Sequence, residues 1–280
     1  MKTNHFYISY FGNKRTEAKY LYDLLDLTNI TTIIEPFCGS CAISYYISTL
    51  HPGKFKYVFN DNDHYLKEMY EIIINEKKLK DFQMVVDNLV NNIQCKDEYN
   101  TIVRQKNIYS WFIKNKVYCM RPGMYKLDYK YDSFKTDILK APICDFFIKE
   151  QQNITFTTND ANECYINYKD DIKNVIILDP PYLTSNNTFY SHPLLDIFNY
   201  LFKHSINDEK AYIYLILEKT LIMAKVFDNL ELYIYDKGYS TNNIKKVNNN
   251  TVINGKRKTE HMICYKKILE DEYIIIDSKK

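Results

Sequence analysis

The feature that most constrains the fold of this chain is an alternation of short apolar segments and amphipathic segments in its first 76 residues. The apolar segments at 31–35 and 56–60 are predicted to be strands, and those at 16–27, 41–50 and 64–76 have helical spacing of apolar residues. A strand followed by a helix and another strand is typical of a parallel sheet with crossover helices. The sequence therefore predicts an α/β fold, Rossmann-like in its connections.

The alternation is interrupted by a mostly helical stretch. Helical periodicity continues from Leu79 and is followed by the single tryptophan, Trp111, and by the turn-forming Arg121-Pro122-Gly123. With 280 residues, the chain is long enough for one large domain with an insertion. We expect a sheet domain formed by residues 1–64 and 151–280, interrupted by a helical insertion at 65–150.

Predicted strands resume after the insertion. They lie at 153–157, 175–179, 211–217 and 230–235, with a helix predicted between 193 and 205. Residues 239–268 are predicted to form a final antiparallel two-stranded hairpin, with an Asn- and Gly-rich tip at 248–255.

The strongest indication of chemistry is the segment Asp179-Pro180-Pro181-Tyr182, directly after an apolar strand. Ligands of open α/β sheets bind at the carboxyl ends of strands, where this segment lies. One reaction that this segment could promote is methylation of the N6 amine of adenine. This amine is a weak nucleophile because its lone pair is delocalised into the ring. Attack on a sulfonium methyl requires acceptors for its two hydrogens, which the Asp179 carboxylate and the Pro180 carbonyl can supply, since consecutive prolines fix φ.

Tyr182 completes this interpretation because its flat ring can stack on a base extruded from a duplex. The alternative for the whole segment is a strand end followed by a rigid proline turn without chemistry. An aspartate before the prolines, a tyrosine after them and a buried strand upstream favour the functional interpretation.

Two further elements precede the insertion. Residues 34–42 contain the small-residue turn Glu35-Pro36-Phe37-Cys38-Gly39, where backbone can approach a nucleotide-like ligand at a helix N-terminus. Asp61 follows the second predicted strand 22 residues after Gly39, near the spacing at which a carboxylate meets ribose hydroxyls in dinucleotide-binding folds. Either element occurs by chance in many α/β proteins, but their order before Asp179 makes them mutually supportive.

In this order the motifs resemble the Dam-like family of adenine-N6 DNA methyltransferases over nearly the whole chain. The family opens with an aromatic-x-Gly-x-Lys segment, here Tyr10 to Lys14, and continues with the acid-Pro-Phe-x-Gly turn at 35–39 and Asn60-Asp61. A helical target-recognition insertion and then Asp-Pro-Pro-Tyr follow, which is the α arrangement of this family. The resemblance implies S-adenosylmethionine as the methyl donor and double-stranded DNA as the substrate.

The resemblance also implies roles for individual residues. Residues implied to contact the cofactor are Tyr10, Lys14, Glu35, Phe37, Gly39, Asp61, Asp160 and Asp179, with Asp61 on the ribose and Asp160 facing the adenine. For Asp160, a loop aspartate that only forms a turn is the alternative. The implied catalytic residues are Asp179, Pro180, Pro181 and Tyr182, which hold the target adenine. Implied DNA contacts are Lys14, Arg121, Lys256, Arg257 and Lys258.

This chain departs from the family pattern at two places. Cys41 stands where the family usually has a second glycine, which bears on how well the cofactor binds. In the insertion, members that read GATC carry Asn-x-x-Arg followed by a Pro-aromatic-Gly, whereas this chain has residues 117–123 without the later segment. Arg121 is the candidate for a bidentate contact to a guanine edge, with an ordinary surface arginine as the alternative. The recognition sequence therefore does not transfer.

Charge is concentrated near the C-terminus. The segment from Lys237 to Lys267 contains eight Lys or Arg residues and only one acid, Glu260, although the net charge of the whole chain is only +2. This segment can meet DNA phosphate or can be a solvated hairpin.

Particular residues also suggest other function classes. Cys38 and Cys41 form a C-x-x-C pair after a strand, so a thiol oxidoreductase with a low-pKa Cys41 is one rival. The dispersed histidines give no zinc-ligand spacing, and no metal is expected. A non-catalytic DNA-binding relative, supported only by Cys41, and methylation of RNA adenine or cytosine N4 are the remaining alternatives.

The sequence also leads to expectations about the protein's surroundings. No apolar run approaches the roughly 20 residues that span a bilayer, and no signal core is found, so we expect a cytoplasmic protein without membrane contact. The odd number of scattered cysteines fits reduced thiols. We expect a monomer or weak dimer, with a cognate restriction endonuclease as a candidate partner.

Overall fold

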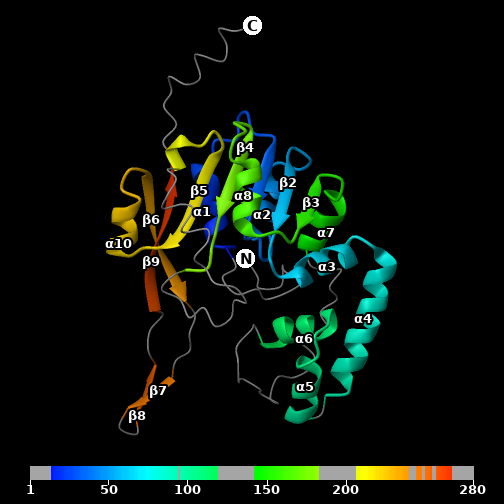
Figure 1. Cartoon of the computed structure of the whole chain (residues 1–280). Helices are drawn as coiled ribbons and strands as arrows, with labels where there is room; N and C mark the ends of the chain where they lie inside the picture. Colours follow the sequence, from blue (N-terminus) through cyan, green and yellow to red (C-terminus); the bar gives the residue numbers. More distant parts are fainter. Residues whose placement is uncertain are drawn as a thin grey trace. The chain divides into compact units, whose positions relative to one another are not determined.

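The computed structural model describes residues 14–93, 95–118, 142–182, 206–239, 244–247, 250–253 and 257–266. It is a mixed α/β structure with a main sheet of seven strands and a second sheet of two (Figure 1). The chain divides into two compact units, Met1–Asn167 and Tyr168–Lys280. The predicted helix at 193–205 lies outside the described residues.

The first unit contains three parallel strands. Their order is β3-β2-β1, with β1 at Thr32–Glu35, β2 at Lys56–Asn60 and β3 at Ile154–Thr157. In this register Tyr57 of β2 lies between Ile33 of β1 and Ile154 of β3. All three predicted strands are confirmed to within one residue, because runs of buried apolar residues bounded by turns mark strands locally.

Eight helices are described in and at the end of this unit. The helix predicted at 41–50 is confirmed as α2, and those at 16–27 and 64–76 each end three residues earlier, at Leu24 and Ile73. The bounds are α1 (Glu17–Leu24), α2 (Ala42–Leu50), α3 (His64–Ile73), α4 (Glu76–Asn91), α5 (Lys96–Val103), α6 (Ile108–Tyr118), α7 (Pro142–Lys149) and α8 (Ala161–Tyr168).

The core of the first unit is an aromatic cluster between β2 and α7. The ring of Phe146 lies 5.4 Å edge-on from that of Tyr57, and Phe147 lies 6.4 Å from Phe59 and 5.5 Å from Tyr70 of α3, measured between centroids. Such contacts between large buried rings anchor α3 and α7 beside the strands. In Figure 1, α4, α5 and α6 gather on one side, away from β1–β3. The assignment of 65–150 to a separate domain remains a prediction.

The second unit contains the other four strands of the main sheet. Parallel strands β4 (Asn174–Leu178) and β5 (Tyr212–Glu218) are followed by β9 (Arg257–Tyr265), which pairs antiparallel with β5 and with β6 (Glu231–Tyr239). A 3₁₀ turn, Ile206–Asp208, precedes β5, and the short α10, Leu221–Val226, follows it. This mostly parallel sheet with a C-terminal antiparallel pair confirms the predicted Rossmann-like methyltransferase fold.

One detail of the predicted hairpin was wrong. The strand predicted at 230–235 extends to Tyr239 and forms one arm of the antiparallel pair, with β9 as the other. Between them, β7 (Ile244–Val247) and β8 (Asn250–Ile253) form a small antiparallel sheet of their own. The error arose because alternation identifies a strand but does not identify its partner.

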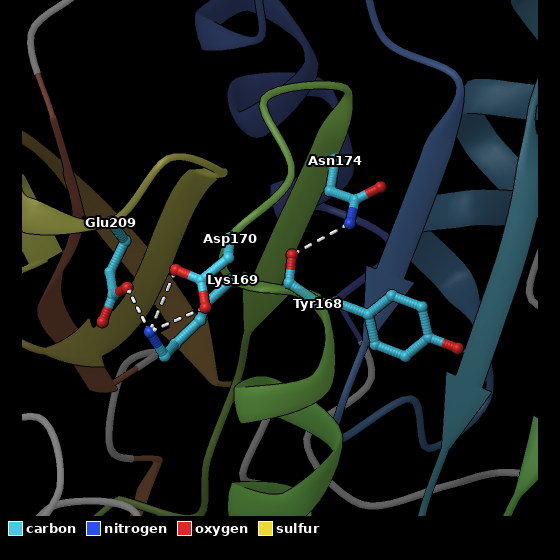
Figure 2. Close-up of polar contacts among 5 residues, drawn as sticks. All are labelled: Tyr168, Lys169, Asp170, Asn174 and Glu209. Atoms are coloured by element: carbon cyan, nitrogen blue, oxygen red, sulfur yellow. Dashed lines mark hydrogen bonds and ion pairs between the residues drawn. The ribbon is translucent and has the colours of Figure 1, made fainter.

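An ion pair between half-buried Lys169 and buried Glu209 holds the start of the second unit together (Figure 2). The Lys169 ammonium lies 2.9 Å from the Glu209 carboxylate, whose side chain is buried, and 3.2 Å from Asp170. The Asn174 side chain donates to the backbone carbonyl of Tyr168 at 2.9 Å. These contacts fix the loops that precede β4 and β5, at the opposite ends of these strands from Asp179.

No helix within the described part of the chain has the length and apolar character that a membrane span requires.

Candidate functional site

The turn between β1 and α2 has the shape that a small-residue segment was predicted to give. Gly39 has φ of 47°, and Cys41 has φ of 57° and ψ of 32°, both in the left-handed region. The Cys41 backbone N–H donates to the Cys38 carbonyl at 2.7 Å, which closes the turn. A β-carbon is disfavoured in this conformation, which glycine adopts without that cost.

Glu35, at the end of β1, is buried and accepts hydrogen bonds from the first turn of α2. One oxygen of its carboxylate accepts from the Ser44 backbone N–H at 3.0 Å and from the Ser44 hydroxyl at 2.5 Å. Ser44 lies in the first turn of α2, where an anionic side chain is stabilised by the unpaired amides. The described contacts of Glu35 therefore hold α2 in place, and a direct contact with the cofactor remains a prediction.

Asn60, the last residue of β2, ties together the carboxyl ends of the three strands. Its amide donates to the carbonyls of Pro36 at 3.1 Å and Asn159 at 3.0 Å. Its side-chain oxygen accepts from the Thr157 hydroxyl at 2.7 Å and the Asn159 N–H at 2.9 Å. Because Asn60 is fully buried and satisfied on both sides, it fixes the loops after β1 and β3 relative to β2.

Asp61 follows Asn60 and reaches the glycine turn. Its carboxylate accepts from the Gly39 N–H at 2.9 Å and from the Asp63 N–H at 3.0 Å, one on each oxygen. Burial raises the pKa of Asp61 to about 7, although the amides of Asp63 and Gly39 lower it, and the charge of Asp63 adds to the rise. Asp61 therefore lies against the glycine turn, and its contact with a ribose remains a prediction.

The thiols of the C-x-x-C pair do not have the properties of a redox site. Cys38 and Cys41 are both buried, and burial raises the pKa of each thiol, that of Cys38 well above its usual value. Reactive cysteines require the opposite, a thiolate favoured by positive surroundings. The thiol oxidoreductase alternative is therefore rejected.

Other predicted cofactor residues of the first unit lie on its loops. Phe37 is half-buried in the turn after β1, and Lys14 is buried just before α1. Asp160 is exposed, and its carboxylate accepts from the Asn162 N–H at 2.8 Å at the start of α8. This is the turn-forming role that the sequence left as the alternative, and a contact with the cofactor adenine remains a prediction. Tyr10 and Arg121 lie outside the described residues.

The Asp-Pro-Pro-Tyr segment follows β4 directly. All five residues of β4 are buried, whereas Asp179, Pro181 and Tyr182 are half-buried and Pro180 is buried. The Tyr182 ring lies edge-on to the imidazole of His261, with centroids 5.2 Å apart, and Tyr235 lies 5.8 Å from the same imidazole. His261 lies on β9, is fully buried, and hydrogen-bonds the Thr259 hydroxyl at 3.1 Å. Tyr182 is therefore packed against a rigid part of the sheet.

The predicted basic contacts lie where β9 begins. Arg257 and Lys258 are its first residues and pair with Tyr239 and Gly238 of β6, and Lys256 lies outside the described residues.

No role was predicted from the sequence for four residues that shape these sites: Asn60, Asp63, Trp111 and His261. Asp63 could have been found, since an aspartate before a helix is a common N-cap, and its side chain does accept from the Tyr65 N–H at 3.2 Å. Asn60 was part of a motif but was given no role, and the contacts of Trp111 with Asp63 and of His261 with Tyr182 join residues distant in sequence. Within the described ranges, no group of His, Cys, Asp and Glu side chains could hold a metal ion.

The fold and these motifs together define a Rossmann-like methyltransferase: a mostly parallel sheet, a carboxylate on a glycine turn, and Asp-Pro-Pro-Tyr after a buried strand. The model of the D12 class N6 adenine-specific DNA methyltransferase family matches residues 10–253, so the chain belongs to this family. Its substrate is accordingly DNA, and the acceptor is the adenine N6 amine.

Two other comparisons add little. No curated protein matches the chain significantly in sequence. Among solved structures, the chain is similar to precorrin 8w decarboxylase of Methanobacterium thermoautotrophicum at 9% identity and a TM-score of 0.35, covering 93% of this chain and 97% of that one. A similarity this low supports no conclusion about the chain.

Proposed function

We propose that the chain transfers a methyl group from S-adenosylmethionine to the N6 amine of an adenine extruded from duplex DNA. The family supplies the adenine acceptor and the DNA, and the donor and the extrusion are our proposal. The observation that carries it is the position of Asp179 and Tyr182, half-buried directly after a fully buried strand. Side chains in that position remain accessible to a ligand while the sheet holds their backbone.

The groups around the glycine turn fit the polar part of S-adenosylmethionine. An ionised carboxylate accepts about four hydrogen bonds, and Gly39 and Asp63 use one on each oxygen of Asp61. Capacity therefore remains for the two ribose hydroxyls. Phe37 and Gly39 would border the methionine part. When bound, the cofactor supplies a sulfonium methyl as the electrophile.

The residues after β4 would act on the adenine. Asp179 and the Pro180 carbonyl accept the two hydrogens of the amine and favour its pyramidal, nucleophilic form, and Tyr182 stacks on the extruded base. His261 supports this role because its buried imidazole packs against the Tyr182 ring and restricts its position. The insertion at 65–150 and the basic residues at 256–258 would contact the DNA.

The Asp179→Ala variant tests the assignment. We expect transfer of labelled methyl to adenine-containing duplexes to be lost, while binding of S-adenosylmethionine, measured by calorimetry, persists. Asp179→Asn keeps the shape and one acceptor, and we expect partial activity. If Asp179→Ala methylates at the wild-type rate, the proposed role of this segment is wrong.

The second candidate function, suggested by Cys41, is that of a DNA-binding relative with impaired catalysis. The left-handed conformation of Cys41 argues against it, because the turn keeps the shape that glycine would allow. Failure of the wild-type chain to bind S-adenosylmethionine at millimolar concentration would support this second candidate. The expected cognate endonuclease and the monomer or weak dimer are further parts of the proposal.

A further inference from the structure

A hydrogen bond joins helix α6 to the loop that carries Asp61. The indole N–H of Trp111 donates to one carboxylate oxygen of Asp63 at 2.8 Å, across 48 residues of sequence. The other oxygen of Asp63 accepts from the Tyr65 N–H as the N-cap of α3. Asp63 is therefore held from two sides, by the first turn of α3 and by α6.

The same residue holds Asp61. The Asp63 backbone N–H donates to Asp61 at 3.0 Å, opposite the bond from Gly39. A continuous series of hydrogen bonds thus runs from the glycine turn through Asp61 and Asp63 to Trp111. Displacing Asp63 would remove one of the two amides that orient the carboxylate of Asp61.

Packing restricts where Trp111 can lie. Its ring is 5.9 Å from that of Tyr65, and on the same helix Tyr109 stacks on Phe82 of α4 and Phe112 meets Phe82 edge-on, both at 5.2 Å. Aromatic contacts of this kind, here centred on buried Phe82 and Phe112, fix the position of a helix. The position of α6 is therefore transmitted to Asp63 by a directional bond.

Charge supports the same arrangement. Burial raises the pKa of Asp63, while the Trp111 and Tyr65 N–H groups and the charges of His64 and Lys114 lower it. Trp111 and Lys114 both belong to α6, so this helix contributes two of the groups that favour an ionised Asp63.

We infer that Trp111 and Asp63 are positioning residues for Asp61, through which helix α6 sets the affinity for S-adenosylmethionine. This inference rests on the proposed function, because it concerns the site that the proposal assigns to the cofactor. It makes α6 part of the cofactor site although the helix lies in the segment predicted to recognise DNA.

The Trp111→Phe variant tests the inference, because phenylalanine keeps an aromatic ring and removes the N–H donor. We expect S-adenosylmethionine to bind roughly fivefold more weakly at pH 7, the equivalent of about 1 kcal/mol. We also expect the midpoint of the pH dependence of binding to move to higher pH, because the amide of Asp63 that favours an ionised Asp61 is displaced. Asp63→Asn, which keeps a side-chain oxygen for Tyr65 but offers Trp111 no second acceptor, should also weaken binding. Its midpoint is not compared with that of Trp111→Phe, because loss of the Asp63 charge by itself lowers the pKa of Asp61.

Ile213→Ala is the control for loss of stability alone, since Ile213 is buried on β5 in the second unit and takes no part in the contacts of α6. We expect it to lower the melting temperature at least as much as Trp111→Phe without moving the pH midpoint. If the wild-type chain binds cofactor, Trp111→Phe matches it in affinity and midpoint, and Asp63→Asn matches it in affinity, the inference is overturned and the proposed function stands. If the wild-type chain does not bind cofactor, the proposed function itself fails.

Discussion

The pH dependence of cofactor binding is the sharpest consequence of the arrangement around Asp61. Burial raises the pKa of this carboxyl to about 7, so near neutral pH it is about half protonated in the free protein. Ribose hydroxyls donate to an ionised carboxylate more strongly than to a neutral acid, so binding favours the ionised form. Binding must therefore release a proton from Asp61 wherever it is protonated, and affinity must rise with pH up to about 7.

The size of the effect follows from this pKa. Below pH 7, the apparent dissociation constant should increase about tenfold for each unit of pH, so binding at pH 6 should be roughly tenfold weaker than at pH 8. Proton release on binding should be about half a proton at pH 7 and nearly one at pH 6. The Asp61→Asn variant should bind about 10- to 100-fold more weakly at pH 8, since it loses charge-assisted hydrogen bonds, and should lose this slope.

Isothermal titration calorimetry measures both quantities when each pH is run in two buffers of different ionisation enthalpy. Titration of the amine and carboxylate of S-adenosylmethionine contributes equally to wild type and variant, so their difference isolates Asp61. Cys38 and Cys41 do not interfere, because the raised pKa of each thiol keeps both neutral over this range.

Either of two results would refute this role of Asp61. The first is a wild-type affinity that stays flat between about pH 5.5 and 8, which would mean that Asp61 is ionised throughout or does not meet the ligand. The second is an Asp61→Asn variant that keeps the full slope, which would assign the proton to another group.

Three further predictions concern stability and DNA binding. Cys41→Gly should be more stable than Cys41→Ala by about 1 kcal/mol in urea unfolding, because glycine relieves the left-handed strain that alanine retains. Lys169→Met should lower the free energy of unfolding by about 2 kcal/mol, since the buried carboxylate of Glu209 loses its cation. Neutralising Lys256, Arg257 and Lys258 together should reduce the salt slope of DNA binding by up to ~0.9 for each phosphate that these side chains neutralise.

Each of these predictions has a control variant or a result that would contradict it. If Cys41→Ala proves the more stable of the pair, the left-handed conformation carries no cost at that position. Lys225→Met removes an ion pair with Asp228 between two exposed side chains and should leave the melting temperature unchanged, in contrast to Lys169→Met. An unchanged salt slope in the triple variant would exclude these side chains from DNA contact.

The strands and the main motifs could be predicted because their signals are local. The three strands of the first unit, β4 and the position of Asp179 after it were marked by runs of apolar residues that end at a turn or a polar residue. Which strands pair could not be predicted in the same way. β9 pairs with both β6 and β5, and the alternation of residues along one strand does not identify its partner. Glu35 was predicted to contact the cofactor from its place in a motif. The motif did not reveal the hydrogen bonds that Ser44 donates to its carboxylate.

By itself, the sequence determined the class of fold, the order of its motifs and the family, because each rests on residue types at fixed spacing along the chain. Only the tertiary structure decided that Asp61 lies half-buried against the Gly39 amide with a raised pKa, that Cys38 and Cys41 are inert, and that Trp111 reaches Asp63. Burial and hydrogen bonding between distant residues set protonation and orientation, and both depend on what the folded chain brings together in space.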